Sequence, residues 1–121
     1  MFVRLKSMSS EELSVITATY EIYKKLIVLN TAIDKKYRFT VSEPVVFSCA
    51  DILEQLILAK HAPRALKATY LINADAKAEV AALKLRTVLE LKLANETNIL
   101  KIQAKLTEAR RQIGGWRKSV S

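Results

Sequence analysis

Residues 99–120 read "ILKIQAKLTEARRQIGGWRKSV", and their apolar residues recur at alternating steps of three and four positions without a break. An α-helix turns once every 3.6 residues, so this spacing places the apolar side chains on one face. The face comprises Ile99, Ile102, Leu106, Ala109, Ile113, Trp116 and Val120. A stripe of this length is typical of a helix that packs along its whole length against the other helices of a bundle.

Two helix starts are predicted upstream from their capping residues. Ser9 stands three positions before Glu12, and Thr40 stands three positions before Glu43. In a capping box of this spacing, the two side chains bond to backbone amides that have no partner within the helix. Pro44 falls in the first turn of the second of these helices, where its missing amide does little harm. A third helix is expected from about residue 64 to 94, and its first half is rich in alanine.

Apolar stripes run along these segments too. The third helix carries Leu71, Ala74, Ala78, Ala81, Leu85, Val88 and Lys92 at steps of three and four. The first helix carries two adjacent stripes, Leu13, Ile16, Tyr20, Tyr23 and Ile27 beside Ile22, Leu26, Leu29 and Ile33. No stretch alternates with period two, so we predict an all-α, antiparallel up-down-up-down four-helix bundle. Loops are expected near residues 35–40, 61–65 and 94–97, with a flexible leader over 1–9 and the bundle domain over 10–121.

Composition supports one helical domain. The chain has 121 residues, half of them hydrophobic, with only two glycines and two prolines. This length suits a single core, and so few turn-forming residues favour long regular elements. Cys49 is the sole cysteine, so no disulfide can form within the chain. Together with the lack of a signal segment or a spanning stretch of about 18 apolar residues, this predicts a cytoplasmic protein.

The two glycines lie away from the apolar seam of residues 99–120. They belong to a second stripe of small or apolar residues on roughly the opposite side of that helix, formed by Leu100, Ala104, Thr107, Gly114 and Gly115. Arg111 interrupts this stripe, but the face, which would meet water in a monomer, is smooth enough to suggest contact with another protein. We therefore predict an oligomer interface there. The alternative is that Gly115 ends the helix as a C-terminal cap.

The sequence offers little for catalysis. His61 is the only histidine and falls where the second helix should end, a position that favours an interaction with the helix dipole. The carboxylates alternate with lysines along the helices, as in solvated ion pairs. There is no glycine-rich phosphate loop, because both glycines lie in "IGGW". We expect no enzyme activity, no cofactor and no metal.

Charge is the stronger functional signal. Lys and Arg number 20 against 12 Asp and Glu, a net charge of +8 that favours polyanionic partners. By segment the net charge is +3 over 1–39, −2 over 40–62, +3 over 63–95 and +4 over 96–121. A membrane-surface helix is disfavoured, because every segment commits its apolar face to the bundle. We predict that nucleic acid is bound by Lys84, Arg86, Lys101, Lys105, Arg110, Arg111, Arg117 and Lys118. For Arg86 the alternative is an ion pair with Glu90, one turn on.

Four stretches resemble a known family. They are "YEIYKKL" (20–26), "RFTVSEPV" (38–45), "LKLRTVLELKL" (83–93) and "IGGWRKS" (113–119), the last being the most specific. With the overall pattern, they make residues 13–119 similar to the accessory variability determinant (Avd) family of diversity-generating retroelements. More broadly, they resemble the four-helix proteins related to ribosomal-RNA intervening-sequence products.

The resemblance implies a basic bundle that assembles into a homopentameric ring and binds the reverse transcriptase of the retroelement together with RNA or DNA. In that setting, the protein supports template-primed cDNA synthesis during mutagenic retrohoming and is not itself the polymerase. The competing hypothesis is a structural, oligomeric four-helix interaction module without a nucleic-acid role. In that case the basic residues only keep the bundle in solution.

Overall fold

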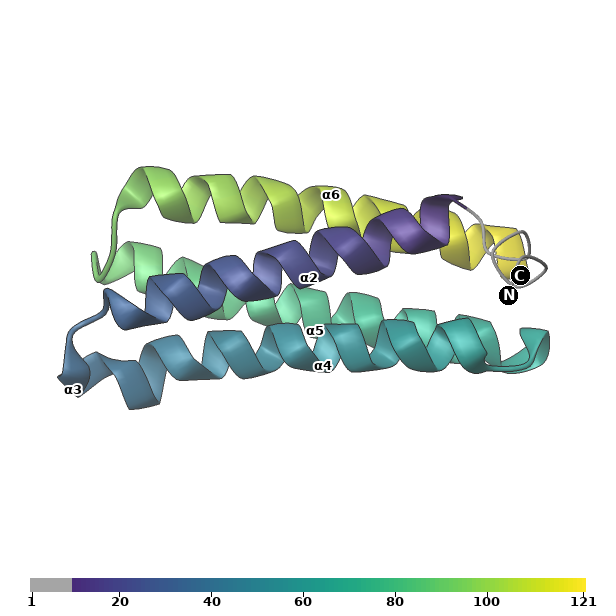
Figure 1. Ribbon diagram of the computed structural model, residues 1–121, viewed down its shortest axis with the longest axis horizontal. Helices are drawn as coiled ribbons and strands as arrows, with labels where there is room; N and C mark the ends of the chain where they lie inside the picture. Colours follow the sequence, from purple (N-terminus) through teal and green to yellow (C-terminus); the bar gives the residue numbers. More distant parts are fainter. Residues whose placement is uncertain (1–9) are drawn as a thin grey trace.

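The structure, a computed structural model, describes residues 10–121, with the side chains of all of them except Ser10, Glu11 and Leu13. The predicted leader 1–9, with the predicted cap Ser9, lies outside the described residues. Four long helices dominate (Figure 1): α2 (Ser10–Thr31), α4 (Glu43–His61), α5 (Arg64–Glu90) and α6 (Glu96–Val120). A short helix α3 (Lys35–Tyr37) and a π-helical turn η1 (Arg38–Ser42) precede α4. Residues 10–121 contain no strand, which confirms the predicted all-α class.

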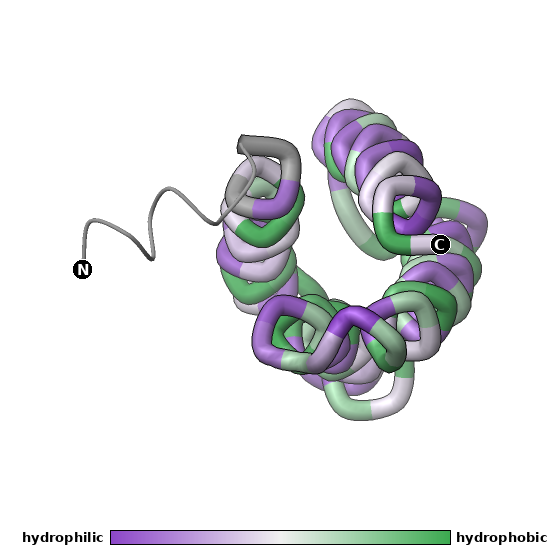
Figure 2. The backbone as a smooth tube through the Cα atoms, turned by 90° about the vertical axis from the view of Figure 1, so that its right-hand side faces the viewer, coloured by the Kyte–Doolittle hydropathy of each residue, from purple (hydrophilic) through white to green (hydrophobic). Residues whose placement is uncertain are grey.

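The long helices lie side by side. In Figure 1 the sequence colours run in one direction along each long helix and in the opposite direction along the next. Viewed end-on in Figure 2, the helices surround a common core. Each of α2 and α5 packs against both α4 and α6. Because the connections are short, helices that follow one another in the chain are also neighbours in space.

The predicted stripes of α5 and α6 form much of the core. All the α6 seam residues from Ile99 to Trp116 are buried, and Val120 packs against them at the helix end. On α5, the stripe from Leu71 to Val88 is buried and includes three alanines. Small side chains there allow the neighbouring helices to approach closely.

The core stripe of α2 differs from the prediction. Tyr20 and Ile27, which we placed on a core stripe, are exposed. Ile22, Leu26 and Ile33 of the second predicted stripe are buried as expected, and Val15 and Thr19, which were not predicted, are buried with them. Thr19 completes this stripe because its hydroxyl donates to the carbonyl of Val15 at 2.8 Å, so a polar residue is buried with its hydrogen bond satisfied. A pattern search limited to apolar residues overlooks such a position.

The start of α4 also differs from the prediction. The chain is helical from Lys35 onward, so the loop predicted near 35–40 is wrong and the capping box of Thr40 with Glu43 does not form. Asp34 caps the helical run instead, accepting the amide of Lys36 at 3.0 Å. Pro44 has no amide hydrogen for the usual helical hydrogen bond. Directly before it, in η1, the backbone hydrogen bonds join residues five positions apart, as in a π-helix.

The end of α5 lies four residues earlier than predicted. The helix stops at Glu90 because Lys92 adopts a left-handed conformation, with φ of 56°. The Lys92 amide donates to the carbonyl of Leu89, and the amide of Leu93 donates to that of Val88, which is the bonding pattern of a Schellman motif. Lys92 is therefore exposed and is not part of the core stripe.

Glycine at position 92 should stabilise the fold. A left-handed residue with a Cβ costs about 1–2 kcal/mol, whereas glycine costs about 0.5–1 kcal/mol of chain entropy. We expect Lys92→Gly to raise the free energy of unfolding by about 0.5–1 kcal/mol, measured by urea denaturation. Lys92→Ala removes the same charge but keeps the Cβ, so it should give no gain. Equal stability of the two variants would contradict this account of the turn.

Cys49 gives the core a pH dependence. Its thiol is buried and donates to the carbonyl of Thr19 at 3.8 Å, and burial raises its pKa from 9.0 to about 12. Between pH 9 and 12, the unfolded chain therefore releases this proton while the folded chain keeps it. The folded state then binds more protons, so stability falls as pH rises through that window.

Cys49→Ala lacks this contribution. We expect the stability of the parent, relative to Cys49→Ala, to decline between pH 8 and pH 10.5 in urea titrations. A constant difference across this range would show that the thiol titrates alike in the folded and unfolded chains.

Candidate nucleic-acid interface

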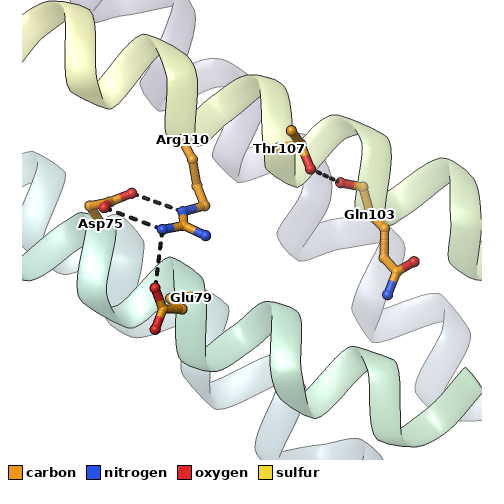
Figure 3. Close-up of polar contacts among 5 residues, drawn as sticks. All are labelled: Asp75, Glu79, Gln103, Thr107 and Arg110. Atoms are coloured by element: carbon orange, nitrogen blue, oxygen red, sulfur yellow. Dashed lines mark hydrogen bonds and ion pairs between the residues drawn. The ribbon is translucent and has the colours of Figure 1, made fainter. Parts of the chain in front are cut away.

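The predicted basic residues do not form one surface, and Arg110 has a structural position. It reaches from α6 to α5, where its Nε and Nη2 donate to the two carboxylate oxygens of Asp75 at 2.9 and 3.3 Å (Figure 3). Nη2 also lies 3.5 Å from Glu79. The Arg110 side chain is only 32% exposed, and its hydrogen bonds to Asp75 raise the pKa of its guanidinium. Arg110 therefore ties two helices together, and its donors face carboxylates of its own chain.

Two predicted residues of α5 are also engaged elsewhere. Lys84 donates from Nζ to the hydroxyl of Ser48 at 2.9 Å, so it belongs to the contact between α5 and α4. Arg86 forms the ion pair with Glu90 that was its alternative assignment, with Nε 3.2 Å from the carboxylate. The structure therefore does not bring Lys84 to the basic residues of α6.

Arg111 lies on the exposed side of α6 and pairs within that helix. Its Nε donates to Glu108 at 2.9 Å. Hydrogen bonds from Arg111, and next from Gln112, lower the pKa of Glu108 to about 2. This carboxylate is thus ionised at any physiological pH and offsets part of the positive charge on this face.

Arg117 and Lys118 belong to a basic surface that the sequence analysis only half identified. The chain has no Asp or Glu between Glu54 and Asp75, or after Glu108. The fold brings these two acid-free segments together, because the α4–α5 connection and the last turn of α6 lie at the same end of the bundle (Figure 1). There the Nη2 of Arg64 donates to the carbonyl of Ser119 at 3.2 Å.

We call this surface the basic end and define it as Lys60, Arg64, Lys67, Arg117 and Lys118. Lys67 caps α4 by donating to the carbonyls of Ala59 and Lys60 at 2.7 and 3.1 Å, whereas Arg64, Arg117 and Lys118 are exposed. Among the side chains that the structure describes at this end, the acidic one is that of Glu12, in the first turn of α2. Lys60, Arg64 and Lys67 were not predicted. The absence of Asp and Glu between Glu54 and Asp75 is the feature of the sequence that could have indicated them.

Lys101 and Lys105 belong to a different surface, a groove of about 540 Å³ between α2 and α6. They share its rim with Lys24 and Lys25 of α2, which we did not predict. Its aliphatic lining residues are Val28, Leu29, Ala32 and Ile102. We call this surface the basic groove. Its one lining carboxylate, Glu21, pairs with Lys24 at 2.9 Å.

The predicted oligomer stripe lies on the outer side of α6. Leu100, Ala104 and Thr107 are exposed, and the Thr107 hydroxyl is satisfied by the carbonyl of Gln103 at 3.0 Å (Figure 3). A Cβ added to Gly114 would meet no atom within 4 Å, so the chain's own packing does not require glycine there. The helix continues past Gly115 to Val120 and neither glycine has a positive φ, so the C-cap alternative is wrong.

None of the helices in residues 10–121 is long and apolar enough to cross a membrane. Over the same residues, no three His, Cys, Asp or Glu side chains gather in a way that could hold a metal ion. Comparisons of the chain with protein-family models, with curated proteins and with solved structures gave no match.

The ion pair between Arg110 and Asp75 should contribute measurably to stability. We expect Arg110→Met to lower the free energy of unfolding by about 1–2 kcal/mol, because a charged hydrogen bond is lost and Asp75 is left half-buried. A double-mutant cycle with Asp75→Asn should give a coupling of about 1 kcal/mol. The matched cycle of Arg111 with Glu108, an exposed pair, should give less than about 0.5 kcal/mol. Equal couplings would contradict the structural role of Arg110.

Proposed function

We propose that this protein is a non-enzymatic accessory protein that binds nucleic acid through the basic end. The observation that carries the proposal is the convergence of the two acid-free segments of the chain at one end of the bundle. Lys and Arg side chains gathered in this way neutralise phosphates, and the release of condensed counterions then drives binding. Such contacts carry no sequence information, so we expect RNA and DNA to bind with little sequence preference.

The finer proposal follows the resemblance to the Avd family. It comprises an antiparallel up-down-up-down bundle, a cytoplasmic location, a homopentameric ring and a partnership with the reverse transcriptase in template-primed cDNA synthesis. Two of the resembling stretches support it, because "YEIYKKL" supplies Lys24 and Lys25 and "IGGWRKS" supplies Arg117 and Lys118. The short connections and the alternating colours of Figure 1 support the antiparallel order.

A structural interaction module is the second candidate. The exposed apolar residues favour it, since thirteen large hydrophobic side chains of the described chain are exposed. In that reading, the basic end serves only to keep the protein in solution. The two candidates differ in whether binding depends on where the positive charge lies.

Reversing two charges at the basic end tests the proposal. We expect Arg117→Glu with Lys118→Glu to weaken binding of a 30-nucleotide RNA or DNA at least about tenfold at 150 mM salt. The log-log salt slope should become shallower by roughly 1.4–1.8, because two phosphate contacts are lost. Fluorescence anisotropy measures both, and Arg110 is left intact because it holds α5 and α6 together.

The matched control is Lys35→Glu with Lys36→Glu. These lysines are also adjacent and exposed, and they lie at the other end of the bundle, so the net charge changes equally. If both double variants lose affinity to the same degree, net charge alone attracts the nucleic acid. If neither loses affinity, the interaction-module candidate is favoured.

A further inference from the structure

The three most exposed large hydrophobic side chains lie on two separate surfaces. Phe39 is 78% exposed, Val28 68% and Phe47 59%. Val28 lines the basic groove. The two phenylalanines lie on η1 and α4, which are not part of the groove. Exposed side chains of this size, gathered with charged neighbours, are typical of protein interaction sites.

The phenylalanines belong to a stripe that is acidic as well as apolar. Phe39, Glu43, Phe47 and Asp51 follow one another at four-residue steps, which keeps them on one side of the helical run. We call this stripe the acidic ridge. From Glu43 on it lies in the segment 40–62, which has a net charge of −2, whereas the segments 1–39, 63–95 and 96–121 each have a positive net charge. Asp51 has a weak ion pair with Lys77 at 3.9 Å, and its side chain remains 53% exposed.

The basic groove has the complementary character. Four lysines line it beside four aliphatic residues, and within the described chain Lys25, Lys101 and Lys105 have no carboxylate partner. Among the described residues that line the groove, none has an aromatic ring on which a nucleic-acid base could stack. This combination suits an acidic protein surface with a protruding apolar side chain better than a nucleic acid.

The two surfaces also lie at the same level along the bundle. Ser42 donates its hydroxyl to the side chain of Asn30, and Cys49 donates to the carbonyl of Thr19. Residues 42–49 therefore stand level with residues 19–30 of α2, the helix that forms one wall of the groove. At 1.5 Å per residue, the ridge from 39 to 51 and the groove wall from 21 to 32 are both about 17–18 Å long.

We propose that the basic groove of one copy receives the acidic ridge of a second copy. The apolar side chains of the ridge contact the lining of the groove, while Glu43 and Asp51 meet its lysines. Because the surfaces stand level, a rotation about an axis parallel to the helices brings them together without sliding one bundle along the other. Each copy has one groove and one ridge, so the contact is heterologous and repeats until a ring closes.

This inference deepens the self-association in the proposed function and does not depend on nucleic-acid binding at the basic end. It also locates the interface away from the small-residue stripe of α6. The acidic ridge shares no residue with that stripe, and the groove is lined by other residues of α6.

Charge reversal on each side tests the contact, with mass measured by light scattering after size exclusion at 150 mM salt. The parent should form a multiple of the 13.6 kDa chain. Lys25→Glu with Lys101→Glu should reduce the mass to that of one chain, and so should Glu43→Lys with Asp51→Lys. The chain with all four changes should associate again, because both charges of the contact are inverted. Phe47→Ser, which leaves the charges intact, should also dissociate the parent.

Three controls keep the test decisive. Thermal unfolding followed by circular dichroism must show that each variant is folded. Lys35→Glu with Lys36→Glu changes the net charge as much as the groove variant does but should leave the mass unchanged. Gly114→Leu should likewise have no effect on the mass.

Several outcomes would overturn the inference. They are a monomeric parent, unchanged mass in both reversed variants, no recovery in the four-fold variant, or dissociation by Gly114→Leu alone. Loss of nucleic-acid binding in the groove variant at unchanged mass would make the groove a nucleic-acid site instead. Failure of the proposed function appears separately, as unchanged anisotropy for Arg117→Glu with Lys118→Glu.

Discussion

Burial of the α6 stripe is the interaction on which the rest of the structure depends. From Ile99 to Trp116, one side of this helix is buried along five turns, against α5 on one flank and α2 on the other. The alanines of α5 allow close packing, and α5 packs more extensively against α4 and α6 than α2 packs against α6. The looser side of the bundle is consequently the one that contains the basic groove.

The same packing determines where positive charge accumulates. Core positions accept no charge, so every Lys and Arg must be on the surface or in a pair. Carboxylates neutralise several of them, in the pairs Asp75 and Glu79 with Arg110, Glu90 with Arg86, Glu108 with Arg111, and Glu21 with Lys24. The surplus remains where the chain lacks acids, at the basic end, and where one carboxylate faces four lysines, in the groove.

Periodicity predicted the helices well and their ends poorly. The stripe of α6 could be predicted because each core position is apolar and no backbone exception interrupts it. The end of α5 could not, because Lys92 is left-handed without being glycine, and the Thr40 cap was displaced by the π-helical turn that precedes Pro44. Thr19 was missed because a hydroxyl that bonds to its own helix counts as polar in a sequence.

The candidate sites were harder to predict because they join distant segments. Arg64 meets Ser119 across 55 positions of the chain, and Lys24 shares a groove with Lys101. A charge count by helix identified the acidic segment 40–62 as different, but it could not show that this segment stands level with a basic groove. Likewise Arg110 looked like any other arginine of α6 until its partners on α5 were known.

The basic end and the groove lie at different positions along the bundle, which allows assembly and binding to proceed separately. From Lys101 to Arg117, α6 advances about 24 Å, which exceeds the Debye length of about 8 Å at physiological salt. Charge at one surface is therefore largely screened from the other. Association through the proposed contact would also keep the bundle axes parallel and present all the basic ends on one side. A long polyanion could then bind several ends at once, so weak individual contacts would give strong binding through effective concentration.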